Sequence, residues 1–96
     1  MANSINGNSG WVTDEGYITS NGNFTCRFDS NSATYKVGYL GHISNAIPVI
    51  SLTDNSDAIV YELTRDSDGF TVKTYDPSNN NAVPCGFDFI VAALYG

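Results

Sequence analysis

The chain has 96 residues, of which 42% are hydrophobic and 15% are charged, and its formal net charge is −6. This length supports one domain with a modest core. The chain has four Lys and Arg against ten Asp and Glu, which excludes the cation clusters that bind nucleic acid or anionic membranes. No apolar run approaches the roughly 20 residues of a membrane span, so we expect no membrane insertion.

The chain begins with a polar segment, MANSINGNSG. It has no basic region followed by an apolar region, so it does not resemble a signal peptide. Its Asn, Gly and Ser content is typical of a flexible lead or linker. We therefore expect residues 1–10 to be such a lead and residues 11–96 to form a single domain.

Segments with strand character then recur between clusters of Asn, Asp, Ser and Gly, which are turn-forming residues. No window has apolar residues at the spacing of a helix. This organisation predicts an all-β fold, an antiparallel β-sandwich of about six to seven strands. The seven segments are Trp11–Thr19, Phe24–Phe28, Thr34–Leu40, Ile47–Thr53, Ala58–Thr64, Phe70–Tyr75 and Cys85–Leu94.

Two of these segments, Ile47–Thr53 and Cys85–Leu94, are apolar on both alternating sets of residues. A strand with one wet face alternates apolar with polar side chains, so a strand that is apolar on both faces needs two covers. The core of a small domain supplies one cover, and a second copy of the chain is the expected source of the other. The sequence thus predicts a homo-oligomer whose interface includes Ile50, Leu52, Ile90, Ala92 and Leu94.

The chain has little that supports catalysis or metal binding. His42 is the sole histidine, with no nucleophile at a motif spacing and no second imidazole, so we expect no enzyme activity and no metal or other cofactor. The turns Asp54–Asp57 and Asp66–Gly69 resemble parts of a calcium loop but lack its distal Glu, and tight turns demand the same residues. Cys26 and Cys85 leave three alternatives open: buried thiols, an intrachain disulfide or an interchain link.

Aromatic and amide side chains supply the candidate ligand contacts. Tyr rings stack on sugars and offer a hydroxyl, although half-buried Tyr is also ordinary in strands. Trp11 belongs with the aromatics expected on outward sets or near turns. The residues predicted to face a ligand are Tyr17, His42, Tyr61, Tyr75, Asn79, Asn80 and Asn81.

Several segments in order carry a resemblance to a known family. The segments are Gly16–Thr19, Phe24–Phe28, Tyr35–Tyr39, Pro48–Thr53, Asp68–Asp76 and Gly86–Ala92. Together they resemble the C-terminal β-sandwich domains of bacteriophage tail fibre and receptor-binding proteins, which are similar in layout to H-type lectin domains. The resemblance implies a trimer with the Phe-Ile-Val strand near the threefold axis and receptor recognition at an exposed tip. Because the later strands lack the lectin tryptophan, no sugar-binding residue is carried over.

The sequence thus leads to two functional hypotheses. The first is a non-enzymatic receptor-binding or adhesion module at the tip of a phage-type tail fibre, which binds a host cell-surface glycan or protein and is located on a virion or another extracellular particle. The alternative is a structural trimerisation cap or capsid decoration protein with no ligand of its own.

Overall fold

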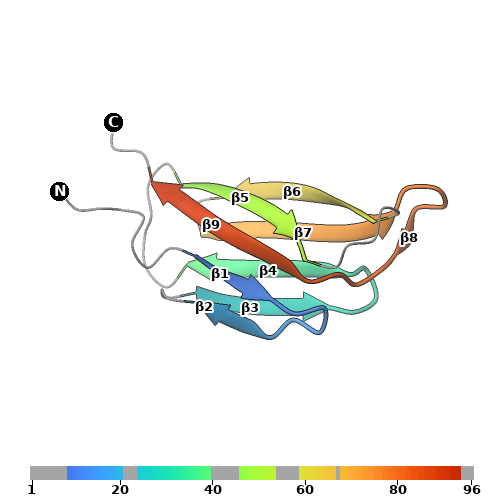
Figure 1. The fold of residues 1–96 in the computed structure, drawn as a ribbon, viewed down its shortest axis with the longest axis horizontal. Coiled ribbons are helices and arrows are strands. Elements are labelled where there is room, and N and C mark those ends of the chain that lie inside the picture. The colour runs from blue at the N-terminus through green and yellow to red at the C-terminus, as the bar shows by residue number, and fades with distance from the viewer. Residues whose placement is uncertain (1–8, 21–23, 40–45, 54–58, 67, 94–96) are drawn as a thin grey trace.

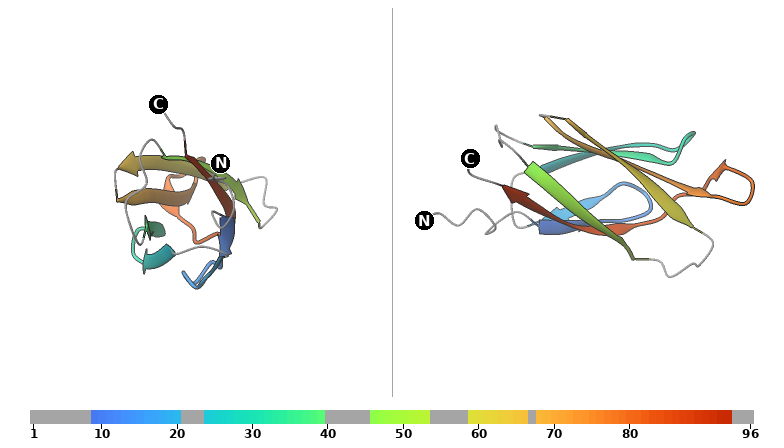
Figure 2. Two further views of the ribbon diagram at one scale, coloured as in Figure 1. Left: turned by 90° about the vertical axis from the view of Figure 1, so that its left-hand side faces the viewer. Right: turned by 90° about the horizontal axis from the view of Figure 1, so that it is seen from above.

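The computed structural model describes residues 9–20, 24–39, 46–53, 59–66 and 68–93, which form nine strands and no helix. These strands make two antiparallel sheets that pack face to face, and the predicted β-sandwich is confirmed (Figures 1 and 2). Within these residues there is no helix of the length and apolarity needed to cross a membrane.

The first sheet has the strand order β2-β1-β9-β5. Its register places Trp11 of β1 opposite Asp88 of β9, and Val49 of β5 opposite Ile90 of β9. The last strand therefore lies in the middle of this sheet, hydrogen-bonded on both sides. The strand bounds are β1 Ser9–Val12, β2 Ile18–Ser20, β5 Ala46–Leu52 and β9 Phe87–Ala93.

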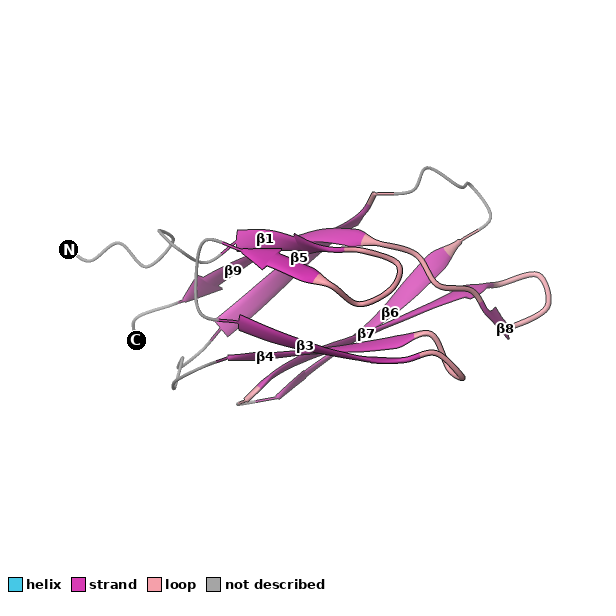
Figure 3. Cartoon of the chain, turned by 90° about the horizontal axis from the view of Figure 1, so that it is seen from below, coloured by secondary structure: helices cyan, strands magenta, loops and turns pink. Residues whose placement is uncertain are grey.

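The second sheet has the order β3-β4-β7-β6, and a short strand, β8, pairs with the end of β7 (Figure 3). The β7–β8 loop projects from the end of the sandwich opposite to the end at which β9 finishes (Figure 1). The strand bounds are β3 Phe24–Asp29, β4 Thr34–Tyr39, β6 Val60–Asp66, β7 Gly69–Asp76 and β8 Asn81–Ala82.

The predicted strand over residues 11–19 is instead a hairpin, β1 and β2. The Thr13 amide donates to the Tyr17 carbonyl at 2.9 Å, which closes the turn. Gly16 sits in this turn at φ +89°, where a side chain is strained, and a Cβ there would run into the Cβ of Phe28 on β3. Ser9 and Gly10, which were expected in the flexible lead, already belong to β1.

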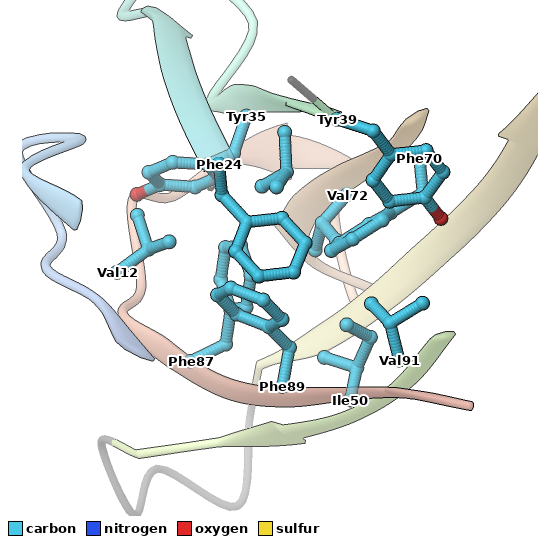
Figure 4. Close-up of a cluster of buried hydrophobic side chains, with 11 residues drawn as sticks. Val12, Phe24, Tyr35, Tyr39, Ile50, Phe70, Val72, Phe87, Phe89 and Val91 are labelled. Atoms are coloured by element: carbon cyan, nitrogen blue, oxygen red, sulfur yellow. The ribbon is translucent and has the colours of Figure 1, made fainter. Parts of the chain in front are cut away.

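Aromatic rings from both sheets meet in the core (Figure 4). Phe89 of β9 makes edge contacts with Phe24 at 5.1 Å and with Phe70 at 5.6 Å between ring centroids. These arrangements are favoured by the ring quadrupole. Phe87 and Val91 point the same way as Phe89 and are fully buried, so β9 supplies the middle of the core.

Tyr35 links the core to two loops through hydrogen bonds of its hydroxyl group. Its buried hydroxyl donates to the Asp14 carbonyl at 2.8 Å and accepts from the Cys85 amide at 3.1 Å. Burial raises the pKa of Tyr35 to about 12 because the charged phenolate would be poorly solvated there. The hydroxyl thereby fixes the β1–β2 turn and the segment that enters β9.

The exposure of individual side chains shows which face of each doubly apolar strand points into the core. On β5, Ile50 is only 8% exposed and Leu52 packs against the core, whereas Val49 is 60% exposed. Ile50 and Leu52 were expected at a subunit interface; for Ile50 this is corrected, because the chain's own core buries it, and Leu52 is partly buried against the same core. On β9, Ile90 is 50% exposed and Ala92 is partly buried on the outward set. Leu94 lies outside the described residues.

Candidate functional site

The outer face of the first sheet is nearly free of charge. Its four strands contain a single charged side chain, Asp88, whereas the strands of the second sheet contain eight. Those eight are Arg27, Asp29, Lys36, Glu62, Arg65, Asp66, Lys73 and Asp76. In an acidic protein, an uncharged sheet face that stays exposed is an unusual surface and is a candidate for binding.

A row of four exposed side chains crosses this face, one from each strand. Trp11 lies opposite Thr19 on β2 and opposite Asp88 on β9, and Asp88 in turn lies opposite Ser51 on β5. Neighbouring strands are about 4.8 Å apart, so the row spans about 14 Å. It places an indole beside a carboxylate, with a hydroxyl at each end.

A groove of about 460 Å³ lies along the β2-β1-β9 part of this row. This volume is within the range of roughly 300–1,000 Å³ typical of small-ligand sites. We call it the Trp11 groove. It is lined by Ser9, Gly10, Trp11, Thr19, Ser20, Asp88, Phe89 and Ile90.

Glycine at position 10 helps to form this groove. A Cβ on Gly10 would collide with the carbonyl oxygen of Thr19 on the adjacent strand. The two strands could then not approach as closely, and Thr19 would move away from Trp11. The groove therefore depends on close backbone contact between β1 and β2, as well as on its exposed side chains.

Over β9 and β5, the neighbouring row on the same face is apolar. Val49 lies directly opposite Ile90, and two residues further along, Ile47 lies opposite Ala92. Val49 and Ile90 are 60% and 50% exposed, and Trp11 is 51% exposed. These values are high for large apolar side chains, and the residues adjoin one another rather than being scattered.

Four of the predicted ligand residues come together at the β7–β8 end. Tyr75 is half-buried opposite Ala82, and Asn79, Asn80 and Asn81 are exposed in the adjoining loop. Internal hydrogen bonds order the loop: the Asn80 amide donates to the Asp76 carbonyl at 2.7 Å, and the Asn81 amide donates to the Asn79 side chain at 2.9 Å. This tip is separate from the Trp11 groove.

The other predicted ligand residues do not join either group. Tyr17 is 70% exposed in the β1–β2 turn but does not line the groove. Tyr61 lies at the side of the sandwich, where its hydroxyl donates to the Ile50 carbonyl at 3.3 Å and so links β6 to β5. His42 lies outside the described residues.

Acidic turns do not assemble a metal site in the described part of the chain, where no group of three or more His, Cys, Asp or Glu side chains converges. Asp66 accepts from the Asp68 amide at 2.8 Å and pairs with Lys36 at 3.2 Å. These two contacts, the amide first, lower the pKa of Asp66. The Asp54–Asp57 turn lies outside the described residues.

The two cysteines are not joined by a disulfide. Cys85 is buried just before β9, and Cys26 is half-buried on β3. Burial raises the pKa of the Cys26 thiol to about 11, so it is protonated and unreactive near neutral pH.

Sequence reasoning named Trp11 among the exposed aromatics but did not connect it with Asp88 or Thr19. A signal for Asp88 existed in the alternation of the last segment, where Asp88 and Ile90 share the set opposite to Phe87 and Phe89. The pairing of Trp11 with Thr19 follows from the β1–β2 turn, which was not predicted. The pairing of Trp11 with Asp88, 77 positions away, had no local signal because it depends on strand order.

No protein-family model, no curated protein and no solved structure matches the chain.

Proposed function

We propose that the chain is a non-enzymatic receptor-binding or adhesion module that takes a carbohydrate in the Trp11 groove. The observation that carries this proposal is the Thr19–Trp11–Asp88 row on an otherwise uncharged sheet face. An indole offers a flat apolar surface to the C–H face of a pyranose ring, and an adjacent carboxylate and hydroxyl accept and donate hydrogen bonds to sugar hydroxyls. A half-exposed Trp11 is available for such stacking without a change in the fold.

The charges favour a neutral sugar. Asp88 is the only charged side chain in the groove lining, and the protein as a whole is acidic. A sialic or uronic acid would bring its carboxylate near Asp88 with no lysine or arginine in the lining to offset the repulsion. The expected ligands are therefore neutral hexoses within a cell-surface glycan.

The same lining supports binding rather than hydrolysis. Glycoside hydrolysis commonly uses two carboxyl groups on either side of the bond that is cut. The groove lining contains one carboxyl group, that of Asp88, and no histidine or cysteine.

The sole tryptophan of the chain makes a direct experiment possible, because its fluorescence reports only on position 11. We expect neutral oligosaccharides from a glycan screen to shift Trp11 emission and to protect it from acrylamide quenching, whereas sialylated counterparts do neither. Calorimetry with the selected glycan should lose its binding signal in Trp11→Ala and weaken in Asp88→Asn.

Thr25→Ala, on the exposed outer side of β3 in the second sheet, is the matched control and should bind as the wild type does. Circular dichroism establishes that each variant is folded. A blank glycan screen, or glycan binding that persists unchanged in a folded Trp11→Ala protein, would reject the groove as the binding site.

The wider setting that we propose is the tip of a phage-type tail fibre on a virion or similar extracellular particle. The arrangement of the chain supports this setting: Ser9 pairs with Ile90, so the first and last described strands begin and end at one end of the sandwich. The ordered β7–β8 loop, with Asn79, Asn80 and Asn81, is at the other end (Figure 1). A fibre joined at the first end would present that loop outward, as a second contact region for a host glycan or protein. Cell-binding assays with the three asparagines replaced by serine test the loop independently of the groove.

A structural role, as a trimerisation cap or capsid decoration protein, is the second candidate. The exposed Val49 and Ile90 side chains favour it, because an apolar sheet face is also what an assembly contact needs. A protein that assembles but binds no glycan and no host cell would support this role over the first.

A further inference from the structure

The Trp11 groove extends beyond the row that contains Trp11 itself. Two of its lining residues, Ser9 and Ile90, lie opposite each other in the next row, about 7 Å further along β1 and β9. In that row, Val49 of β5 lies opposite Ile90 on the other side of β9. The groove therefore opens toward Val49, although Val49 does not line it.

Large apolar side chains form a continuous strip from Trp11 to Val49. Ile90 is diagonal to Trp11 across the β1–β9 pair, at about 7–8 Å, which is within reach of an aromatic ring. Ile90 is also directly opposite Val49, at about 5 Å. All three side chains are at least half exposed. A ligand that covered this strip would remove a connected apolar surface from water, which favours binding.

Hydrogen-bonding groups and apolar groups adjoin each other on this face in different rows. Thr19 and Asp88 flank Trp11 in the first row. Ile90 and Val49 are adjacent in the second. The hydroxyls of a neutral hexose suit the first row, but a hydroxyl placed over Ile90 and Val49 would exchange water for side chains without donors or acceptors. A molecule that fits both rows therefore has hydroxyls at one end and an apolar group at the other.

We propose that the Trp11 groove takes an amphiphilic glycoside, a neutral hexose with an apolar group attached through its anomeric oxygen. The inference rests on the proposed function, since the sugar ring stays on Trp11 beside Asp88. The apolar group crosses Ile90 and ends on Val49. An anomeric oxygen that carries such a group has no O–H to satisfy, so it can lie next to Ile90 at little cost.

Calorimetric titration with the methyl and hexyl glycosides of glucose, galactose and mannose tests the proposal. Burial of a methylene raises affinity about fourfold when it is complete and about twofold when it is half complete, as on an open sheet face. The additional methylenes of the hexyl group should therefore make the hexyl glycoside of the bound hexose bind about 30-fold more tightly than its methyl glycoside.

Val49→Ser should reduce this hexyl advantage by about threefold or more, because it removes the apolar end of the strip. Binding of the methyl glycoside should not change, since Val49 is outside the groove lining. Val49→Ile is the matched control and should retain the full advantage. Val49 is exposed, so neither substitution disturbs the core. In methyl NMR spectra, the hexyl glycoside should shift the resonances of both Val49 and Ile90, and the methyl glycoside those of Ile90 alone.

Two results overturn this inference and leave the groove as a sugar site. They are equal affinities for the methyl and hexyl glycosides, and a hexyl advantage that is unchanged in folded Val49→Ser. Two others reject the proposed function as well. They are hexyl binding that survives in folded Trp11→Ala, which means that the chain alone is bound, and no binding of any glycoside in the set.

Phosphatidylcholine vesicles that display the bound hexose on a lipid distinguish two sources of such a glycoside. Protein that sediments with the vesicles assigns the ligand to a membrane glycolipid. Protein that stays in solution while the hexyl advantage holds assigns it to a dispersed glycoside, and either result supports the proposal.

Discussion

Replacement of Tyr35 by phenylalanine should destabilise the fold far more than the loss of one oxygen atom suggests. The ring would keep its stacked contact with Phe28 at 4.5 Å and its edge contact with Phe87 at 5.4 Å. What would be lost is the bond to the Asp14 carbonyl and the bond from the Cys85 amide. At about 1 kcal/mol for each buried hydrogen bond, the free energy of unfolding should fall by about 2 kcal/mol.

Urea denaturation monitored by circular dichroism measures this difference. For a domain of this size, a loss of about 2 kcal/mol lowers the melting temperature by about 8–16 °C. Tyr17→Phe is the control, because Tyr17 is 70% exposed and its hydroxyl is solvated in both states. It should change stability by less than about 0.5 kcal/mol.

A Tyr35→Phe protein as stable as the wild type, or a Tyr17→Phe protein that is destabilised equally, would refute this role of the Tyr35 hydroxyl. The dependence of stability on pH in the alkaline range gives a second check. Burial raises the pKa of Tyr35 from 10.0 to about 12, so the folded state retains this proton longer than the unfolded state does. Its contribution to stability is present below pH 10 and is lost as the pH rises through about 12, a loss that Tyr35→Phe should not show.

Three further predictions concern other parts of the fold. Phe89→Ala should lower the free energy of unfolding by about 3–5 kcal/mol, because it leaves a cavity in the core. Ile90→Ala, at an adjacent but half-exposed position, should lower it by much less, and chemical denaturation measures both. Gly16→Ala should destabilise by about 1–2 kcal/mol or more in thermal melts, since a side chain is strained at φ +89°. Hydrogen bonds from the Ser78 hydroxyl and amide lower the pKa of Asp76. The contribution of Asp76 to the stability of the fold is therefore present above the ordinary carboxyl pKa and is lost as the pH falls. Ser78→Ala should raise the pKa of Asp76 in an NMR titration.

The sandwich was predictable from side-chain alternation. In the segments that became β3 and β4, the inward sets were evident as Phe24, Cys26 and Phe28, and as Tyr35 and Val37. A period of two, bounded by turn residues, leaves few alternatives to a packed antiparallel sheet. The division of the first segment into two strands was missed, because the Asp-Glu-Gly turn sits within a run that otherwise has strand character.

The orientation of the doubly apolar strands was harder to predict, since both sets of residues look equally suited to a core. One polar residue in each strand determines which set faces water. Ser51 shares the Val49 set of β5, and Asp88 shares the Ile90 set of β9, so those sets face water. A buried lone carboxylate would cost several kcal/mol, and a single polar residue can therefore orient a whole strand.

The candidate groove could not be assembled from the sequence. The β1–β2 hairpin brings Trp11 beside Thr19, but Asp88 joins them only through a strand order that pairs the first described strand with the last. Local patterns report on which face a residue occupies, but not on which strand lies beside it.

The central place of β9 has a consequence for the order of events during protein synthesis. β9 is the last strand of the sandwich to leave the ribosome, yet β1 and β5 hydrogen-bond to it from either side and it supplies Phe87, Phe89 and Val91 to the core. Until residues 87–93 emerge, the first sheet lacks its central strand, and the aromatic rings of the second sheet lack the side chains that pack against them. The sandwich can therefore close only after its last strand has been translated, in one late step dominated by contacts between distant parts of the chain.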